Sequence, residues 1–410
     1  MGILSVSEAL AKTFASLPPT QLSTVPLVDA VHHILAERIQ ADRDLPPFDK
    51  SAVDGYAIAP VESTKILPFT FKVKGLSKAG SRWPGTLKSG EACQIMTGAP
   101  VPPGAERIIM VEDTTRVGDS VRIATLGEPQ QHIQPRGREV QQGSVLLSPG
   151  TWIRSSEVGV LATVGKSYVQ VFRKPTIGVL ATGDELVEPD IVPGADQIRN
   201  SNGYALTAQI RSSYFEVTFL GVARDTKADT LKKIEMGLQK EVLILSGGVS
   251  KGEFDYVKDA LLEKGALFEF DQIAIKPGKP LVFGKVQNTY IFGLPGNPGS
   301  SFTTCELFVL PFLKGWSGFP VYRPRLLQGI LNFEIKAKGN RTHYLPVLIE
   351  LKKDVWTLSK LPYAGSADVL ALALANGFLV VEPDHSYRQG ELAPFLFFSE
   401  NAPFPEPLQK

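Results

Sequence analysis

The sequence predicts a multidomain α/β protein whose centre is a doubly wound parallel sheet, with β-rich regions before and after it. Between residues 177 and 316, short apolar runs alternate with amphipathic helical runs, which is typical of a parallel sheet. The run 242–245 is short and rich in β-branched residues, as a buried parallel strand should be. By contrast, residues 69–121 and the chain from 322 onward show short strands broken by Gly and Pro.

Composition narrows the class of protein. With 410 residues the chain is long enough for several domains, and its formal net charge of +1 gives no general attraction to nucleic acid or membranes. Two cysteines make no disulfide framework, and five scattered histidines show no zinc-binding spacing. Neither a signal peptide nor an apolar run long enough to cross a membrane is evident. We therefore expect a cytoplasmic protein without nucleic-acid or membrane partners.

The N-terminal elements predict a domain that is interrupted by an insertion. Ser5 and Glu8 form a capping box that should begin a first helix, and apolar spacing predicts a second helix over 26–39. A short helix over 155–164 should pack back on these two. The expected domains are an N-terminal linker domain (1–43 and 138–173), a β-rich insertion (44–137), an α/β domain (174–316) and a C-terminal β-rich domain (317–410).

Two polar loops of the insertion are candidate site segments. Residues 45–57, LPPFDKSAVDGYA, carry Asp49 and Asp54 in a loop before a strand. Thr97 lies in the small-residue turn 95–100, IMTGAP. On physical grounds alone each carboxylate could simply form a turn, and the threonine turn could be structural.

Three carboxylates follow strand ends of the predicted sheet. Glu185 and Asp225 lie just past strands, and Asp255 follows a glycine turn. Each alone could cap a helix. Because the carboxyl ends of parallel strands meet at one edge, together they favour a magnesium ion that bridges a phosphate over a zinc site.

Three glycine-containing turns, 246–250, 276–280 and 293–298, each follow an apolar run. Adjacent glycines allow backbone N–H groups to approach an anion, and lysines on rigid loops suit a phosphorylated ligand. Any one turn could be turn chemistry alone, but three at strand ends with fixed charge predict a phosphate site. Its candidate residues are Gly247, Gly248, Ser250, Lys276 and Lys279.

These segments carry a family resemblance. SGGVSKGEFDY, IKPGKP and GLPGNP, together with PPFDKSAVDGYA, IMTGAP and ATGDEL, resemble the motifs of the MoeA family, the molybdopterin molybdenumtransferases, which includes the E domain of gephyrin. The matches run in order along nearly the whole chain. Related molybdopterin adenylyltransferases and CinA-like proteins share the α/β fold, but only the MoeA family adds the DGYA segment with its β-rich insertion.

The resemblance implies an activity. A MoeA-like enzyme takes adenylylated molybdopterin and molybdate, cleaves the phosphoanhydride with Mg²⁺, releases AMP and leaves molybdenum on the dithiolene sulfurs. An adenylyltransferase would act upstream and molybdoenzymes downstream. The family works as an elongated homodimer whose active site is shared between subunits, and the N-terminal domain would serve dimerisation.

The resemblance also assigns residues. It implies catalytic roles for Asp54 and Thr97, which would face the α/β domain of the partner chain. The sheet-edge acids Glu185, Asp225 and Asp255 would be catalytic and would hold the metal. The substrate-binding residues would be Gly247, Gly248, Ser250, Lys276, Lys279, Pro295, Pro298, Arg341, Ser366 and Glu139.

The chain departs from the family pattern at two places. Arg138-Glu139 stands where the family usually has Glu-Asp, and Gln272 replaces a lysine that some relatives carry. Alternative functions are a tungstate-inserting homologue, a molybdopterin adenylyltransferase and a non-catalytic scaffold. The sequence does not distinguish molybdenum from tungsten and does not name a recipient enzyme.

Overall fold

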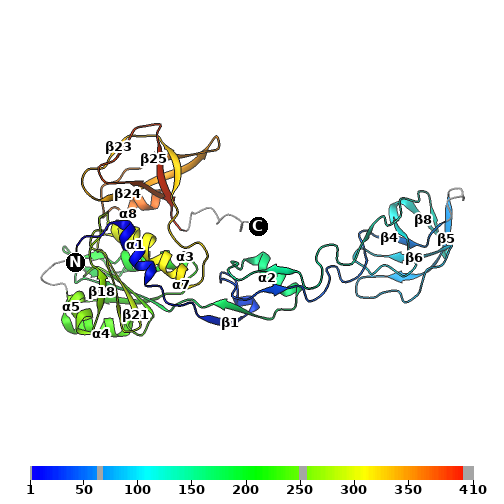
Figure 1. The fold of residues 1–410 in the computed structure, drawn as a ribbon, viewed down its shortest axis with the longest axis horizontal. Helices are drawn as coiled ribbons and strands as arrows, with labels where there is room; N and C mark the ends of the chain where they lie inside the picture. The colour runs from blue at the N-terminus through cyan, green and yellow to red at the C-terminus, as the bar shows by residue number, and fades with distance from the viewer. Residues whose placement is uncertain (1, 62–67, 249–255, 400–410) are drawn as a thin grey trace. The chain divides into compact units, whose positions relative to one another are not determined.

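The structure is a computed structural model that describes residues 2–61, 68–248 and 256–399. It divides into two compact units (Figure 1). Unit 1 comprises Met1–Thr24, His32–Leu35 and Gln170–Lys410, and unit 2 comprises Val25–Val31 and Ala36–Val169. The finer division into four domains stays a prediction.

Unit 1 is built on the predicted doubly wound sheet. Its strand order is β16-β13-β17-β21-β20-β18, in which the first four strands are parallel to one another and β20 pairs antiparallel with both β21 and β18. Every residue of β13, β17 and β21 is buried, because helices cover both faces. The strands are β13 Ile177–Thr182, β16 Thr218–Ala223, β17 Val242–Ser246, β18 Leu267–Phe270, β20 Val282–Val286 and β21 Thr289–Leu294.

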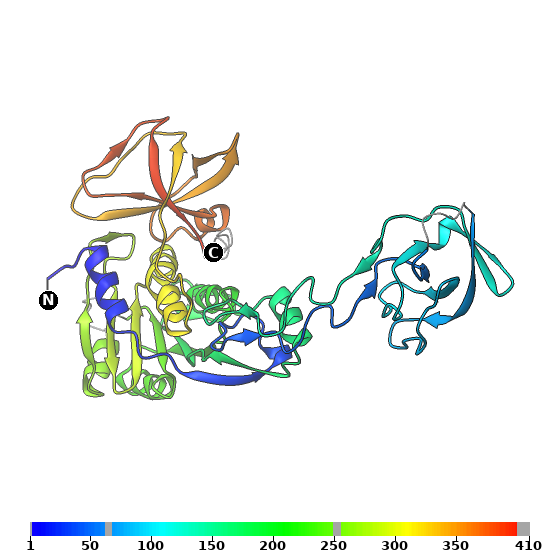
Figure 2. The same ribbon diagram turned by 45° about the vertical axis from the view of Figure 1, so that its right-hand side comes forward.

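Helices pack on opposite faces of this sheet (Figure 2). Leu206 and Ile210 of α3 (Asn202–Ser212) join the core cluster on one face. The second cluster, on the other face, contains Ile234 of α4 (Lys227–Gly237) and Leu261 of α5 (Tyr256–Glu263). This arrangement confirms the alternating strand and helix pattern of the sequence. Because the chain places β16 on one side of β13 and β17 on the other, the direction of strand addition reverses between β13 and β17.

The apolar helix after the last parallel strand contains a π-helical turn. It consists of α6 Pro298–Thr304, the π turn Cys305–Val309 and α7 Leu310–Trp316. In the turn, buried Glu306 accepts hydrogen bonds from Gln209 Nε2 (2.9 Å) and from the backbone N–H of Ser399 (2.6 Å). Burial raises the pKa of Glu306. The contact ties the end of the C-terminal region to this helix, against which α1 (Val6–Ala15) also packs.

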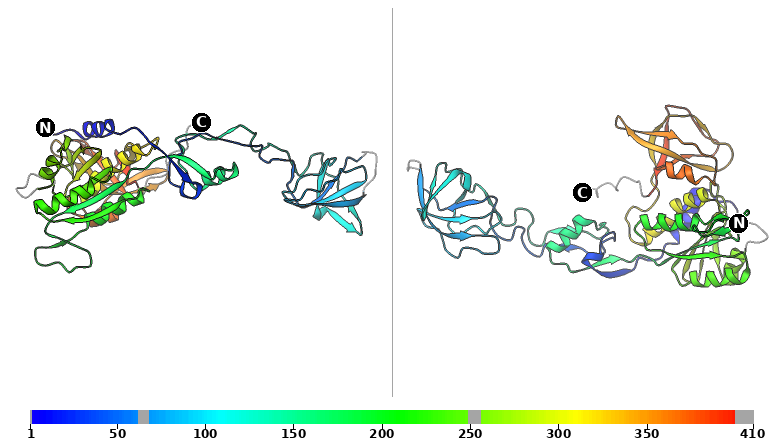
Figure 3. Two further views of the ribbon diagram at one scale, coloured as in Figure 1. Left: turned by 90° about the horizontal axis from the view of Figure 1, so that it is seen from below. Right: turned by 180° about the vertical axis from the view of Figure 1, so that it is seen from behind.

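A second sheet of unit 1 forms the C-terminal region (Figure 3). Its order is β19-β24-β25-β22-β28-β26, and the further pairing of β24 with β26 closes five of the strands into a ring. The first strand, β19, comes from the lysine-containing turn of the α/β region. The strands are β19 Ile275–Lys276, β22 Leu327–Leu331, β24 Thr342–Lys352, β25 Val355–Lys360, β26 Gly377–Val381 and β28 Leu392–Phe397; smaller elements are α8 Val369–Leu374 and the pairs β14 Leu186–Val187 with β15 Ile198–Arg199 and β23 Ile335–Lys336 with β27 Ser386–Tyr387.

Unit 2 contains the predicted β-rich region. Its six-stranded sheet has the order β7-β4-β6-β5-β9-β8. Alternate residues of the central strands pack into two clusters, one around Ile58 and Phe71 and one around Cys93 and Ile108. The strands are β4 Gly55–Ile58, β5 Phe69–Ser77, β6 Glu91–Ile95, β7 Arg107–Met110, β8 Thr114–Val117 and β9 Ser120–Ile123; β3 Lys50–Ser51, β10 Ile133–Gln134, β11 Val145–Leu147, α2 Ser155–Thr163 and the 3₁₀ turn Val111–Asp113 complete it.

The predicted helix over 26–39 is wrong. The chain instead forms β1 (Leu22–Pro26), a 3₁₀ turn (Leu27–Asp29) and β2 (Ile39–Gln40), which pairs with β11. Strand β1 pairs with β12 (Tyr168–Phe172). The apolar residues that suggested one helical face are not buried together, since Val28 is 79% exposed. Pairing with strands distant in sequence overrides the local helical spacing.

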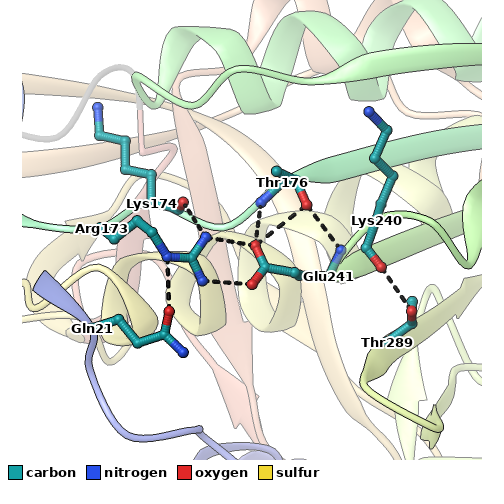
Figure 4. Close-up of polar contacts among 7 residues, drawn as sticks. All are labelled: Gln21, Arg173, Lys174, Thr176, Lys240, Glu241 and Thr289. Carbon is teal, nitrogen blue, oxygen red and sulfur yellow. Dashed lines mark hydrogen bonds and ion pairs between the residues drawn. The ribbon is translucent and has the colours of Figure 1, made fainter. Parts of the chain in front are cut away.

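An ion pair fixes the point where the chain enters the central sheet (Figure 4). Arg173 Nη1 and Nη2 donate to the two carboxylate oxygens of Glu241 at 2.8 and 2.5 Å. The backbone N–H of Thr176 donates to the same carboxylate at 2.9 Å, and Arg173 Nε donates to Gln21 Oε1 at 3.0 Å. The hydrogen bonds from Arg173 are the main cause of the lowered pKa of Glu241. Glu241 thus joins the segment before β13 to the start of β17.

We expect Glu241→Ala to destabilise unit 1 by about 2 kcal/mol, because it removes several hydrogen bonds to a half-buried charge. Calorimetry should show the transition of unit 1 lowered by roughly 4–8 °C at neutral pH. Since folding lowers the pKa of Glu241, this contribution is present above its ordinary pKa and is lost as the pH falls through the folded-state value. The control is Glu235→Ala, because that exposed carboxylate pairs with Lys264 and should contribute little. Equal effects of the two substitutions would contradict the assignment.

Candidate functional site

The switch point between β13 and β17 is the first part of the site. Gly247 follows β17 with a φ of 89°, and an added Cβ would lie 2.9 Å from the carbonyl oxygen of Thr182 and 3.0 Å from its Oγ1. Gly248 has a φ of 65°, and an added Cβ would lie 2.8 Å from the same Oγ1. Both positions therefore require glycine. In open α/β sheets, ligands bind at such a point.

The turn after β21 reaches the same place. The backbone N–H of Gly247 donates to the carbonyl of Leu294 at 3.1 Å. Asn202, the first residue of α3, donates from Nδ2 to Ser246 Oγ at 2.9 Å and to the carbonyl of Gly296 at 2.7 Å. Gly247 of the first predicted turn and residues 294 and 296 of the third are therefore close together, and Asn202 contacts both segments.

Ser366 of the C-terminal region contacts the same turn. Asn297 Nδ2 donates to Ser366 Oγ at 2.8 Å, and the backbone N–H of Gly299 donates to the Ser366 carbonyl at 2.9 Å. Pro298 is the first residue of α6, and the carbonyl of Pro295 accepts from Ser301 Oγ. Ser366 and both prolines thus lie together, as predicted. Asn297 is a further polar member that the sequence did not single out.

The lysine turn joins the two sheets of unit 1. Gly278 packs against α6, since an added Cβ would lie 2.6 Å from Thr304 Cγ2. Exposed Lys276 lies on β19 and pairs in register with His343 of β24. Arg341 lies two residues before His343, and both cations lower the pKa of that histidine. Lys276 and Arg341 are therefore near each other, and exposed Lys279 continues the turn.

Of the acids at the sheet edge, Asp225 contacts the neighbouring Asp184 through reciprocal hydrogen bonds to backbone N–H groups. The backbone N–H of Asp184 donates to Asp225 Oδ2 at 3.2 Å, and that of Asp225 donates to Asp184 Oδ1 at 3.0 Å. Arg224 Nη1 donates to the carbonyls of Asp184 and Leu186, at 3.1 Å each. Asp184 is thus an additional carboxylate beside Asp225, which the ATGDEL segment contained but which was not selected.

Glu185 is exposed, and its carboxylate folds back over Gly183, where an added Cβ would lie 2.4 Å from Oε2. Within residues 2–61, 68–248 and 256–399, no three His, Cys, Asp or Glu side chains are close enough to hold a metal ion. Asp255 and Ser250 lie outside the described residues. The predicted convergence of Glu185, Asp225 and Asp255 stays a prediction.

In unit 2, Asp54 and Thr97 are in direct contact. The backbone N–H of Thr97 donates to Asp54 Oδ1 at 2.6 Å, and its hydroxyl donates to the same oxygen at 2.8 Å. The contact arises because β4 pairs with β6 in a register that places Gly55 opposite Ile95. Both bonds lower the pKa of the exposed Asp54, the backbone bond more than the hydroxyl bond.

Glu139 lies in a separate polar contact of unit 2. Its Oε1 is 3.6 Å from Lys50 Nζ and accepts a hydrogen bond of 2.7 Å from Gln134 Nε2. The neighbouring Asp49 accepts a hydrogen bond of 2.7 Å from the backbone N–H of Arg136. Asp49 thus joins two segments that are far apart in the sequence.

Comparison with known proteins agrees with this arrangement. Family models match as MoeA N-terminal region (domain I and II) over residues 4–165, probable molybdopterin binding domain over 178–315, and MoeA C-terminal region (domain IV) over 328–398. Two similar proteins are both named molybdopterin molybdenumtransferase. The one from Haemophilus influenzae is 34% identical over 387 residues, 93% of this chain and 95% of its own length. The one from Staphylococcus aureus is 32% identical over 377 residues, 91% of this chain and 90% of its own length.

Solved structures extend the likeness to the fold. Two structures of a molybdopterin biosynthesis MoeA protein from Pyrococcus horikoshii superpose with TM-scores of 0.79 and 0.75 at 30% and 27% identity. Each comparison covers 97% of this chain and 100% of the other.

We expect Thr97→Val to raise the pKa of Asp54 part of the way toward its ordinary value, because the hydroxyl donor is lost and the backbone donor remains. Titration of the side-chain carboxyl ¹³C resonance would measure it. Thr97→Ser, which keeps the hydroxyl, should leave the pKa low. Asp44, whose carboxylate is held by Gln142 and Arg136, serves as an internal reference that should not move. An unchanged Asp54 pKa in Thr97→Val would show that the hydroxyl bond has no effect.

Proposed function

The chain belongs to the MoeA family, and from this premise we propose that it is a molybdopterin molybdenumtransferase. The reaction would insert molybdate into adenylylated molybdopterin and release AMP. The names of the curated relatives support this assignment. The observation that carries it is the meeting of two glycine turns and Ser366 around the β13–β17 switch point, where a phosphorylated ligand is expected.

The glycine turn after β17 would bind the phosphate end of the substrate. Gly247 and Gly248 allow this turn to pack closely against Thr182, and Ser250 would contribute to the same loop. Lys276 and Lys279, which lie on the neighbouring turn, would neutralise the negative charge of the phosphate groups. Cleavage of a phosphoanhydride depends mainly on positioning and charge neutralisation, so these groups suit the reaction.

The acids suit Mg²⁺ by their donor chemistry. Asp184, Glu185 and Asp225 offer only carboxylate oxygens, the ligands that Mg²⁺ prefers. Arg224 donates to backbone carbonyls and not to these carboxylates. The carboxylates of Asp184 and Asp225 each accept one backbone N–H, so their remaining lone pairs can bind a metal ion. We propose that Glu185, Asp225 and Asp255 hold the ion, with Asp184 as their neighbour. The bound ion would supply positive charge at the phosphoanhydride.

The oxyanion would bind beside the C-terminal region. Arg341 would supply charge, and the hydroxyl of Ser366 accepts from Asn297, which leaves its O–H able to donate to an oxyanion. Pro295 and Pro298 would form a rigid wall of the pocket.

We further propose that the working form is a homodimer. Asp54, Thr97 and Glu139 belong to unit 2 and would complete the active site of a second copy of the chain. An adenylyltransferase would supply the substrate, and molybdoenzymes would receive the product. No helix in the described part of the chain is both long enough and apolar enough to span a bilayer, and we propose a cytoplasmic location.

Single-turnover incubation with adenylylated molybdopterin and Mg²⁺ tests the proposal. We expect AMP release that requires molybdate or tungstate, with the preferred oxyanion identifying the metal. Lys276→Ala should slow release by about a hundredfold, because a charge-neutralising group is lost. Lys264→Ala is the matched control, since that lysine pairs with Glu235.

Other outcomes would contradict the proposal. Adenylylation of molybdopterin with ATP would identify an adenylyltransferase, and tight binding without release would identify a scaffold. Full activity of Lys276→Ala would overturn the site assignment.

A further inference from the structure

His343 is a third titratable side chain beside Lys276 of the proposed phosphate site and Arg341 of the proposed oxyanion site. It pairs in register with Lys276 of β19 on one side and with Val381 of β26 on the other. Residues paired across neighbouring strands project to the same face of the sheet, as do residues two apart along a strand. Lys276 and His343 therefore share one face at the joint between the two sheets, and Arg341, directly before β24, is close enough to act on the charge of His343.

The environment of His343 is unusual for a histidine. Its side chain is buried, with only 7% of the residue exposed, and among the described residues Nε2 has no hydrogen-bond partner. A buried polar atom without a protein partner is costly and calls for another partner, such as a ligand, an ion or a water molecule.

The charged and titratable groups around His343 come from three strands. Strand β19 contributes Lys276, β24 contributes Tyr344, and Arg341 directly precedes β24. Glu382 follows β26, and its carboxylate accepts a hydrogen bond of 3.0 Å from Thr342 Oγ1. Burial is the larger cause and the two cations the smaller cause of a lowered His343 pKa, so the ring is neutral at pH 7 in the free protein.

We propose that His343 takes up a proton when a doubly charged oxyanion binds beside Lys276 and Arg341. The inference rests on the proposed function, because it assumes that this face receives the oxyanion. Two negative charges offset the repulsion from the two cations and favour the imidazolium. The proton comes from solvent onto a ring nitrogen, and it returns to solvent when the oxyanion leaves.

Proton uptake on binding determines the direction in which the affinity for the oxyanion changes with pH. Because the bound state holds more protons than the free state, affinity rises as the pH falls. One proton limits the change to tenfold per pH unit, and we expect the Kd for tungstate to fall about tenfold from pH 8 to pH 6. Tungstate at micromolar concentration stays a monomeric dianion over this range, so the change would report on the protein.

Calorimetric titration of the full chain with sodium tungstate tests the inference. Measurements at three pH values, in pairs of buffers with different ionisation enthalpies, give both the Kd and the protons taken up. His343→Gln keeps a polar side chain that does not titrate, and it should abolish the pH dependence. His385→Gln is the matched control, because His385 is exposed in the same region and its ring contacts that of Tyr387. It should retain the wild-type slope.

A second measurement uses the unmodified chain, so that its result does not depend on whether the His343→Gln variant folds. The ¹³Cε1 resonance of His343 should titrate at higher pH with tungstate than without it. Tungstate binding without proton uptake, or uptake that persists in His343→Gln, would overturn the inference and leave the proposed function intact. Failure of the wild-type chain to bind tungstate, together with AMP release that needs no oxyanion, would overturn both.

Discussion

The close approach of three strand ends is the constraint on which the rest of unit 1 depends. Gly247 lies so near Thr182 that any side chain would clash, and its N–H is bonded to the carbonyl of Leu294. The β13, β17 and β21 ends are thereby held at one point. Asn202 then bonds to two of these ends from the start of α3. Packing alone therefore requires glycine at 247 and 248, before any charged side chain contributes.

The C-terminal region is aligned with that point by backbone pairing. Because β19 belongs to the lysine turn yet joins the C-terminal sheet, the register of one parallel pair fixes Arg341 and His343 relative to Lys276. A second attachment, from Asn297 and Gly299 to Ser366, fixes the other end. Both attachments are formed within the chain and need no substrate. The ligand therefore meets groups whose positions are already set, which lowers the entropy cost of binding.

What could be predicted from sequence was mainly local. Strand β17 and the glycine turns carry short-range signals, and the structure has them where those signals place them. The helix over 26–39 failed because the segment pairs with strands more than a hundred residues away, which local periodicity cannot detect. Asn297 and His343 were missed because their contacts are with residues far along the chain. The contact of Asp54 with Thr97 was expected only from the family resemblance, since neither residue type is unusual in a turn.

The charged groups of unit 1 are separated by sign. The acids Asp184, Glu185 and Asp225 lie beside the ends of β13 and β16, whereas Lys276 and Arg341 lie at the joint of β19 with β24. Among the residues that the structure describes, none of these five side chains forms an ion pair with another protein group, although twelve ion pairs occur elsewhere. An internal ion pair would have to break before a ligand could bind, and that cost would reduce affinity. Because the acids and the cations are apart, no internal ion pair among these five side chains would have to break when a charged ligand binds.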